Sequence, residues 1–239
     1  MIKFSLSSFL IVLLSLSGIN TFSQVNYSEL ALTGRGDLEL VGTQDKLQKE
    51  VFEAFKKMQQ DALKDSISIE IASAYRSFDR QKEIWNRKYD AYISEGLSPQ
   101  EAIEKIIAYS TIPGTSRHHW GTDIDLIEEV VKLPESLLTE ENYINNGVFS
   151  NFKKWMDENS EKYGFYLVYD NNIDRKGFKY EPWHYSYKKL SYPMLEEFIK
   201  IDLIKLLQSV NLKGNKYITP VFLQKYTNEN ILEINPKLK

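Results

Sequence analysis

Apolar positions in the first half of the chain follow the period of helices, interrupted by one strand-like stretch. Residues 67–71 alternate isoleucine with polar residues, which predicts a half-buried strand. A second helix is expected after Ser77, and a third begins at Ser98, where Pro99 and Glu101 complete a capping-box pattern. The first helix is predicted over residues 44–62, with one apolar face formed by Leu47, Val51, Phe52, Phe55 and Met58.

The second half adds strands and two more helices. Residues 122–127, 165–169 and 183–187 are predicted strands, the last two rich in aromatic residues. Residues 150–163 are predicted to form a helix that Gly164 ends, and residues 194–210 a last amphipathic helix. With no internal repeat or low-complexity linker, these elements predict one α+β domain over residues 24–239, built on a small, mainly antiparallel sheet flanked by helices.

The beginning of the chain has the three-part pattern of a cleaved secretory signal over residues 1–23. Lys3 provides the positive start, residues 4–19 are apolar and serine-rich without a charge, and Thr21 and Ser23 offer small side chains at the two positions that a signal peptidase reads. A membrane anchor is the alternative, but the apolar run is shorter than the ~20 residues a span needs. We therefore expect export across the inner membrane, a periplasmic or extracellular, envelope-associated protein, and no stable membrane span after cleavage.

Composition narrows the chemistry. Hydrophobic residues make up 42% and charged residues 26% of the chain, and the net charge is −3 with both signs mixed, so no nucleic-acid partner is expected. The chain has no cysteine, which excludes disulfides, thiolate ligands and thiol nucleophiles. Any bound metal must be held by carboxylates and by the three histidines.

All three histidines lie in two short segments, residues 113–125 and 180–185, and both segments also carry carboxylates. A catalytic zinc ion takes three protein ligands and leaves one position open, and His118, Asp125 and His184 supply that number. Gly121 lies between the first two and lets the backbone turn so that they converge. Glu181 is the natural general base, because a nearby carboxylate can take a proton from water at the metal.

These motifs resemble the VanY-type D-alanyl-D-alanine carboxypeptidase family. The resemblance rests on Ser116-x-His118-x-x-Gly121-x-x-x-Asp125 followed by Glu181-Pro182-Trp183-His184, with Ser73-Ala74-Tyr75-Arg76-Ser77, Gln81 and Tyr163-Gly164-Phe165 in support. That family shares a wider fold group with lysostaphin-like enzymes and the hedgehog signalling domain. The resemblance covers about residues 40–190 and leaves residues 191–239 as a C-terminal helical extension.

The resemblance implies a hedgehog/DD-peptidase-like fold with Zn²⁺ on His118, Asp125 and His184. It implies Glu181 as the catalytic base and Arg76 as a group that steadies the substrate carboxylate or the developing oxyanion, for which a guanidinium is suited. Ser116 and Gln81 would add hydrogen bonds to the end of the peptide.

Two residues near the motifs fall outside this scheme. The family commonly has a small apolar residue where Asp123 stands, so the predicted strand carries two carboxylates on one side. Asp123 is then either a partner of a metal ligand or a residue at the rim of the site. His119 is expected to pack or to lie beside the substrate rather than to bind metal, because neighbouring residues of a strand point apart.

Three functions compete. The leading one is a zinc carboxypeptidase that hydrolyses the terminal D-Ala-D-Ala bond of peptidoglycan stem peptides. The second keeps the metal but acts as an L,D-carboxypeptidase or an endopeptidase on wall peptides. The third is a non-catalytic peptidoglycan-binding zinc module, against which Glu181 argues, because a purely structural site needs no base.

Overall fold

Four antiparallel strands form the central sheet of the computed structural model, which describes residues 27–239. The strand order is β3-β4-β6-β5, with β3 at Ile69–Ser73, β4 at Asp123–Glu128, β5 at Phe165–Leu167 and β6 at His184–Tyr187. All pairs of neighbours run antiparallel, as the sequence predicts. The predicted signal segment, residues 1–23, lies outside the described residues.

The pairing of β4 with β6 sorts their side chains between two faces. Asp125 lies opposite His184 and Asp123 lies opposite Ser186, and directly paired residues of antiparallel strands share a face. Ile124, which pairs with Tyr185, lies on the other face. The sheet therefore carries a polar face at its centre, backed by an apolar one.

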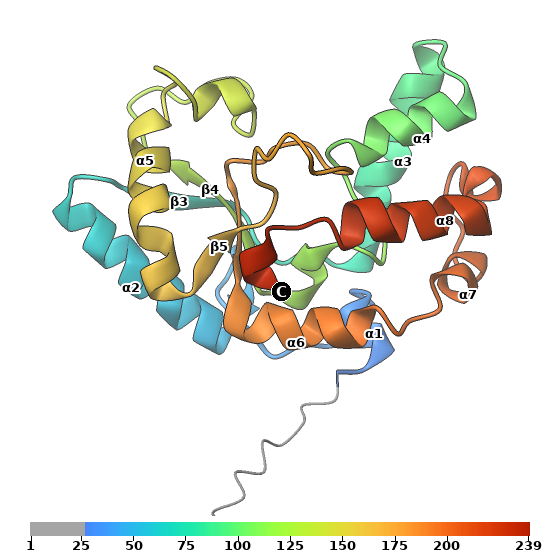
Figure 1. Cartoon of the computed structure of the whole chain (residues 1–239), viewed down its shortest axis with the longest axis horizontal. Helices are drawn as coiled ribbons and strands as arrows, with labels where there is room; N and C mark the ends of the chain where they lie inside the picture. Colours follow the sequence, from blue (N-terminus) through green and yellow to red (C-terminus); the bar gives the residue numbers. More distant parts are fainter. Residues whose placement is uncertain (1–26) are drawn as a thin grey trace, which may run out of the picture.

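The apolar face packs against α2 (Lys49–Lys64) and α5 (Ser150–Asn159), which lie on one side of the sheet in Figure 1. Their buried side chains meet those of the strands in one cluster that includes Val51, Phe55, Met58, Phe152, Met156, Ile124, Leu126 and Tyr185. This core fixes the backbone of β4 and β6 from behind, so the opposite face can carry polar groups.

A second core joins the polar side of the sheet to the C-terminal part of the chain. Its helices are α3 (Phe78–Ser94), α4 (Pro99–Ile107), α6 (Lys188–Phe198), α7 (Leu203–Gln208) and α8 (Pro220–Tyr226). The indole N–H of Trp85 donates to the Lys213 carbonyl at 2.9 Å, and the Tyr226 hydroxyl accepts from the Ile112 N–H at 3.2 Å. Residues 191–239 are thus built into the molecule, and α8 supports the loop that leads to the histidines.

The remaining elements are short. They are α1 (Glu29–Leu32), the hairpin β1 (Leu40–Val41) and β2 (Leu47–Gln48), the 3₁₀ turns η1 (Arg117–Trp120), η2 (Glu140–Asn142), η3 (Ser160–Tyr163), η4 (Asn215–Tyr217) and η6 (Pro236–Leu238), and the π turn η5 (Thr227–Ile231).

Local signals in the sequence placed several helix ends correctly. Ser77 accepts a hydrogen bond from the Arg80 N–H at the start of α3, and the capping box of Ser98 and Glu101 starts α4. Gly164 adopts the left-handed conformation, with φ +83, after η3. The predicted segment 150–163 is helical throughout, with its last turn tightened to 3₁₀.

Two predicted helices differ from the structure. The first helix begins at Lys49 rather than near residue 44, because Leu47–Gln48 pair with β1 and the Gln48 N–H donates to the Gly121 carbonyl. The last predicted helix, 194–210, is wrong as one element. The structure forms α6 from Lys188, continuing through Pro193, and starts α7 separately where Asp202 caps the Lys205 N–H at 3.0 Å.

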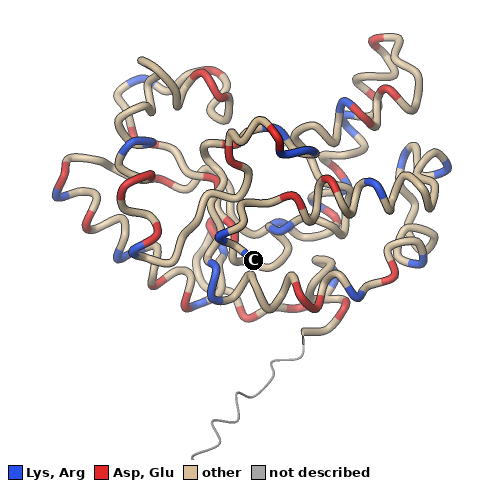
Figure 2. Tube along the Cα trace, viewed as in Figure 1, with Lys and Arg blue, Asp and Glu red and all other residues tan. Residues whose placement is uncertain are grey.

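From residue 27 onward, charged residues of both signs are interspersed along the trace, and none of the elements described there is made up of lysine and arginine alone (Figure 2). Within residues 27–239, none of the helices combines the length and apolar character needed to cross a membrane.

Candidate metal centre and active site

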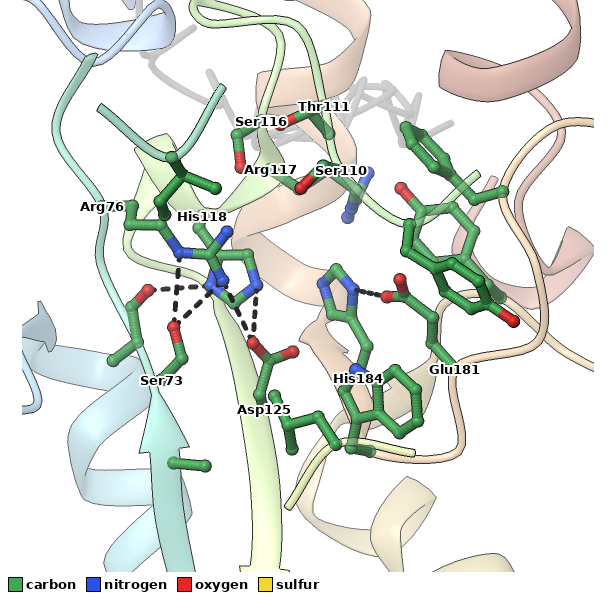
Figure 3. A pocket seen from close by; sticks show the side chains of 18 of the residues that line it. Ser73, Arg76, Ser110, Thr111, Ser116, Arg117, His118, Asp125, Glu181 and His184 are labelled. Carbon is green, nitrogen blue, oxygen red and sulfur yellow. Dashed lines mark hydrogen bonds and ion pairs between the residues drawn. The ribbon is translucent and has the colours of Figure 1, made fainter. Parts of the chain in front are cut away.

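The polar face of the sheet forms the floor of a cleft of about 950 Å³. The walls come from the β3–α3 connection, the start of η1, the residues before β6 and the loop around η2. His118, Asp125 and His184 meet in this cleft, and each offers a ligand atom within 4.8 Å of the other two (Figure 3). All three side chains are buried.

Hydrogen bonds fix which nitrogen each imidazole turns to its neighbours. His118 Nδ1 lies 2.7 Å from the Ala74 carbonyl, which can only accept, so Nδ1 carries the proton and Nε2 is free to bind metal. His184 is held the other way round, because its Nε2 donates to Asp123 Oδ2 at 3.0 Å and leaves Nδ1 facing the site. The two rings lie 4.8 Å apart between centroids.

Asp125 completes the group and has an unused acceptor. Its Oδ2 accepts from Arg76 Nη2 at 3.1 Å and lies 3.4 Å from His118 Nε2. Its Oδ1 is buried and has no hydrogen-bond partner among the described residues. A buried carboxylate oxygen without a partner is costly, and a cation bound between the two imidazoles would satisfy it. The donor set of two neutral nitrogens and one carboxylate suits zinc.

Asp123 is a partner of a ligand and not a rim residue, because its side chain is fully buried. Besides His184, its oxygens accept from Arg117 Nε at 2.8 Å, the Ser186 hydroxyl at 2.7 Å and the Thr122 hydroxyl at 2.8 Å. Burial opposes ionisation, but Arg117 and His184 hold the pKa of Asp123 well below its usual range. Arg117 and Ser186 were missed from the sequence, although Ser186 lies two residues after His184, on the same strand face.

His119 has a structural position. The segment 117–120 is a 3₁₀ turn rather than a strand, so the expected reason for excluding His119 as a ligand was wrong, although His119 is not part of the metal-binding group. Its Nδ1 donates to the Arg76 carbonyl at 2.6 Å and its Nε2 accepts from the Gly114 N–H at 3.1 Å. Burial lowers the pKa of His119 to about 3, so the ring stays neutral and ties two loops together.

Glu181 lies beside the metal-binding group because the chain turns between it and His184. The His184 N–H donates to the Glu181 carbonyl at 3.0 Å, and the turn brings Glu181 Oε2 to 3.0 Å from His184 Nδ1. Burial raises the pKa of Glu181, with His184 acting in the opposite direction. A buried carboxylate of raised pKa in a cleft is placed to exchange protons.

Arg76, Gln81 and Ser116 occupy three different positions. The Arg76 guanidinium lines the cleft and also donates to Ser73 Oγ. Ser116 lines the cleft as well. Gln81 is fully buried behind Arg76: its Oε1 accepts from Arg76 Nη1 at 3.2 Å and its Nε2 donates to the Thr111 carbonyl at 3.0 Å. The direct contact with substrate expected for Gln81 is replaced by a contact that orients Arg76.

The family model for VanY, D-alanyl-D-alanine carboxypeptidase, matches residues 44–190, more than half of the chain. The chain belongs to the VanY family of D-alanyl-D-alanine carboxypeptidases. The matched range contains every residue of the site described above and ends at the start of α6.

Two curated relatives are D-alanyl-D-alanine carboxypeptidases of enterococci. The Enterococcus faecalis protein is 30% identical over 118 residues, covering 49% of this chain and 39% of that protein. The Enterococcus faecium protein is 26% identical over 206 residues, covering 81% of this chain and 56% of that protein. The alignments therefore span between about two fifths and just over half of the lengths of these relatives.

Solved structures agree in fold. VanYB in complex with D-alanine-D-alanine matches with a TM-score of 0.52 and 23% identity, over 74% of this chain and 92% of that chain. A vancomycin resistance D,D-pentapeptidase VanY in complex with Zn(II) matches with a TM-score of 0.53 and 22% identity, over 77% of this chain and 90% of that chain. The predicted α+β architecture is confirmed as a VanY-like fold with a four-stranded antiparallel sheet.

Proposed function

We propose that this protein is a zinc-dependent carboxypeptidase that removes the terminal D-alanine from D-Ala-D-Ala stem peptides of peptidoglycan. The observation that carries the proposal is the group of His118, Asp125 and His184, turned into an open cleft with Glu181 beside it, in a chain of the VanY family. The relatives named D-alanyl-D-alanine carboxypeptidase support this choice of bond.

Zinc would be held by His118 Nε2, Asp125 and His184 Nδ1. A zinc ion bound there would act as a Lewis acid and lower the pKa of a coordinated water toward ~7. The Ala74 carbonyl and the Asp123 carboxylate each accept from the other ring nitrogen, so His118 Nε2 and His184 Nδ1 are the nitrogens left to bind a metal. Arg76 holds Asp125 in place from the wall of the cleft.

Glu181 would be the general base. Its carboxylate lies beside His184 Nδ1 in the lining of the cleft, where it can accept a proton from the attacking water and return it to the leaving amine. Its raised pKa suits both steps, because burial makes the carboxylate a stronger base than that of an exposed glutamate and makes its protonated form easier to reach. Glu181 also separates this proposal from a non-catalytic zinc module.

Ser116 and Arg76 would contact the substrate. Both line the cleft on the side of the β3–α3 connection, with the remaining N–H of Arg76 Nη1 available to a carbonyl or oxyanion. Gln81 would act by holding Arg76.

The test is hydrolysis by protein loaded with zinc. Incubation with an N-acylated peptide ending in D-Ala-D-Ala should release one equivalent of D-alanine, and treatment with a chelator should stop the reaction until zinc is restored. Mass analysis of digested muropeptides distinguishes loss of the last D-alanine from an L,D-cut or an internal cut. Product masses that show only an internal or L,D-cut would contradict the proposed bond.

We further propose that the protein acts outside the inner membrane, since its proposed substrate is there and residues 1–23 have the pattern of a signal. Cell fractionation with an antibody against the mature chain tests this. Retention of the uncleaved chain in the cytoplasm would contradict it.

A further inference from the structure

Lys88 is a half-buried cation in the same cleft, and neither the motifs nor the comparisons assign it a role. It comes from α3, two helical turns after Gln81, and lines the cleft together with Arg76, Glu181 and His184. Its ammonium donates to the Ser110 hydroxyl at 2.9 Å. The side chain thus lies within the chamber that holds the metal-binding group.

The ammonium of Lys88 has no carboxylate partner. It forms no ion pair with any acidic side chain of residues 27–239. Burial lowers the pKa of Lys88, while the charge of Glu181 acts in the opposite direction. An ammonium has three N–H donors, and Ser110 accepts one. Two strong donors therefore remain for a ligand, in a place where an unpaired charge is costly.

Arg76, in contrast, is largely engaged with the protein. Its Nε donates to Ser73, its Nη1 to Gln81, and its Nη2 to both Ser73 and Asp125. A guanidinium has five N–H donors. Four of them are used in these contacts, including the one from Nη2 to the metal-binding carboxylate of Asp125, so one N–H of Nη1 remains. Arg76 alone cannot also offer a fork to the terminal carboxylate of a peptide.

Three residues with hydroxyl groups line the same cleft as Lys88. Ser110, Thr111 and Ser116 lie together in the wall of the cleft, above His118 and His184 in Figure 3. Because Ser110 accepts from Lys88, its own hydroxyl hydrogen can be donated to a ligand. The wall therefore combines a cation with neutral donors, which suits a carboxylate.

We infer that Lys88, together with Ser110, binds the α-carboxylate at the C-terminal end of the peptide and so limits the enzyme to the last bond. The inference rests on the proposed function and adds the residue that makes the enzyme a carboxypeptidase. A charged hydrogen bond of this kind contributes roughly 1.5–3 kcal/mol, which corresponds to about a 10- to 100-fold change in KM.

The experiment compares one N-acylated peptide ending in D-Ala-D-Ala with the same peptide as its C-terminal amide. The zinc-loaded wild-type protein should prefer the free acid. Lys88→Met should raise KM for the acid about 10- to 100-fold, with little change for the amide, and should remove the preference. Lys88→Arg keeps the positive charge and should retain much of the preference for the free acid. Zinc content and thermal unfolding show that each variant is loaded and folded.

Arg87→Met is the matched control, because it removes a neighbouring positive charge from an exposed position of α3 outside the cleft. It should keep the preference for the acid. If Lys88→Met affects acid and amide equally, or affects neither, the role of Lys88 is wrong while the proposed function stands. If the wild-type protein hydrolyses neither peptide, the proposed function fails and the role of Lys88 fails with it.

Discussion

Asp123 should have two separable roles, and replacing it by alanine exposes both. Its carboxylate neutralises the buried Arg117 and holds the Nε2–H of His184. Removing one partner of a buried ion pair costs about 3–5 kcal/mol, because the other charge stays behind without compensation. Removing the group that orients a metal-binding histidine typically weakens metal affinity about 10- to 100-fold.

Two measurements test the expected losses of stability and of zinc affinity. Urea unfolding of the chelated protein should show Asp123→Ala destabilised by about 3–5 kcal/mol. Competition with a fluorescent chelator should show its zinc Kd raised about 10- to 100-fold. Ser186→Ala serves as a graded control: it removes the hydrogen bond that Ser186 donates to Asp123 Oδ1 and the one that it accepts from Arg117 Nη2, but it leaves the contact of Asp123 with His184 in place. Its zinc Kd should therefore stay near that of the wild type.

The double variant Arg117→Met with Asp123→Ala separates the two roles. Removing both charges should restore most of the lost stability, since no buried charge is left unpaired. Zinc affinity should remain low, because the imidazole of His184 has still lost its acceptor. A double variant that recovers both quantities, or a single variant with unchanged zinc Kd, would refute the orienting role of Asp123.

Three further predictions concern catalysis, pH and backbone geometry. Glu181→Gln should keep bound zinc but lower kcat about 10²- to 10⁴-fold, measured by D-alanine release; a normal rate would exclude Glu181 as the base. In the chelated protein, burial lowers the pKa of His184, but the hydrogen bonds to Asp123 and Glu181 outweigh it and raise the pKa to about 9. Because this pKa lies above the unfolded value of ~6.5, the charged imidazole of His184 stabilises the fold by roughly 3 kcal/mol below pH ~6.5. This stabilisation is lost as the pH rises from ~6.5 to about 9. Urea unfolding across this range tests it, and a flat profile would contradict it. Gly121 has φ +64, and an added Cβ would meet Leu40 Cδ2 at 2.7 Å, whereas a Cβ at Gly96 (φ +93) would meet nothing within 4 Å. Thermal unfolding should therefore show Gly121→Ala clearly more destabilised than Gly96→Ala, and equal losses would argue against the close packing of η1 on the hairpin.

Local signals in the sequence determined much of the secondary structure and the candidate chemistry. Caps such as Ser77 and Ser98 act within one turn of a helix, so their effect can be predicted without knowing the fold. The three histidines and the absence of cysteine restrict metal ligands by residue type alone. Spacing within each motif then selected the residues that the structure brings together as a metal-binding group, namely His118, Asp125 and His184.

Long-range contacts decided the features that the sequence did not reveal. The start of α2 depends on a carbonyl at Gly121, more than seventy residues further along, and the placement of Gln81 behind Arg76 depends on the carbonyl of Thr111. The break between α6 and α7 is different, because the Asp202 cap that starts α7 is a local signal that the apolar periodicity of residues 194–210 does not describe.

The polar partners of the site belong to the same group of features. Ser186 meets Asp123 because β4 and β6 pair in one register, and Lys88 reaches the cleft because α3 packs beside it. The sequence by itself thus determined which side chains can bind metal and move protons, since residue type sets that chemistry. Only the tertiary structure decided which ring nitrogen of each histidine is held by a neighbouring acceptor and which cations lack an acidic partner within residues 27–239, because partners distant in sequence set both.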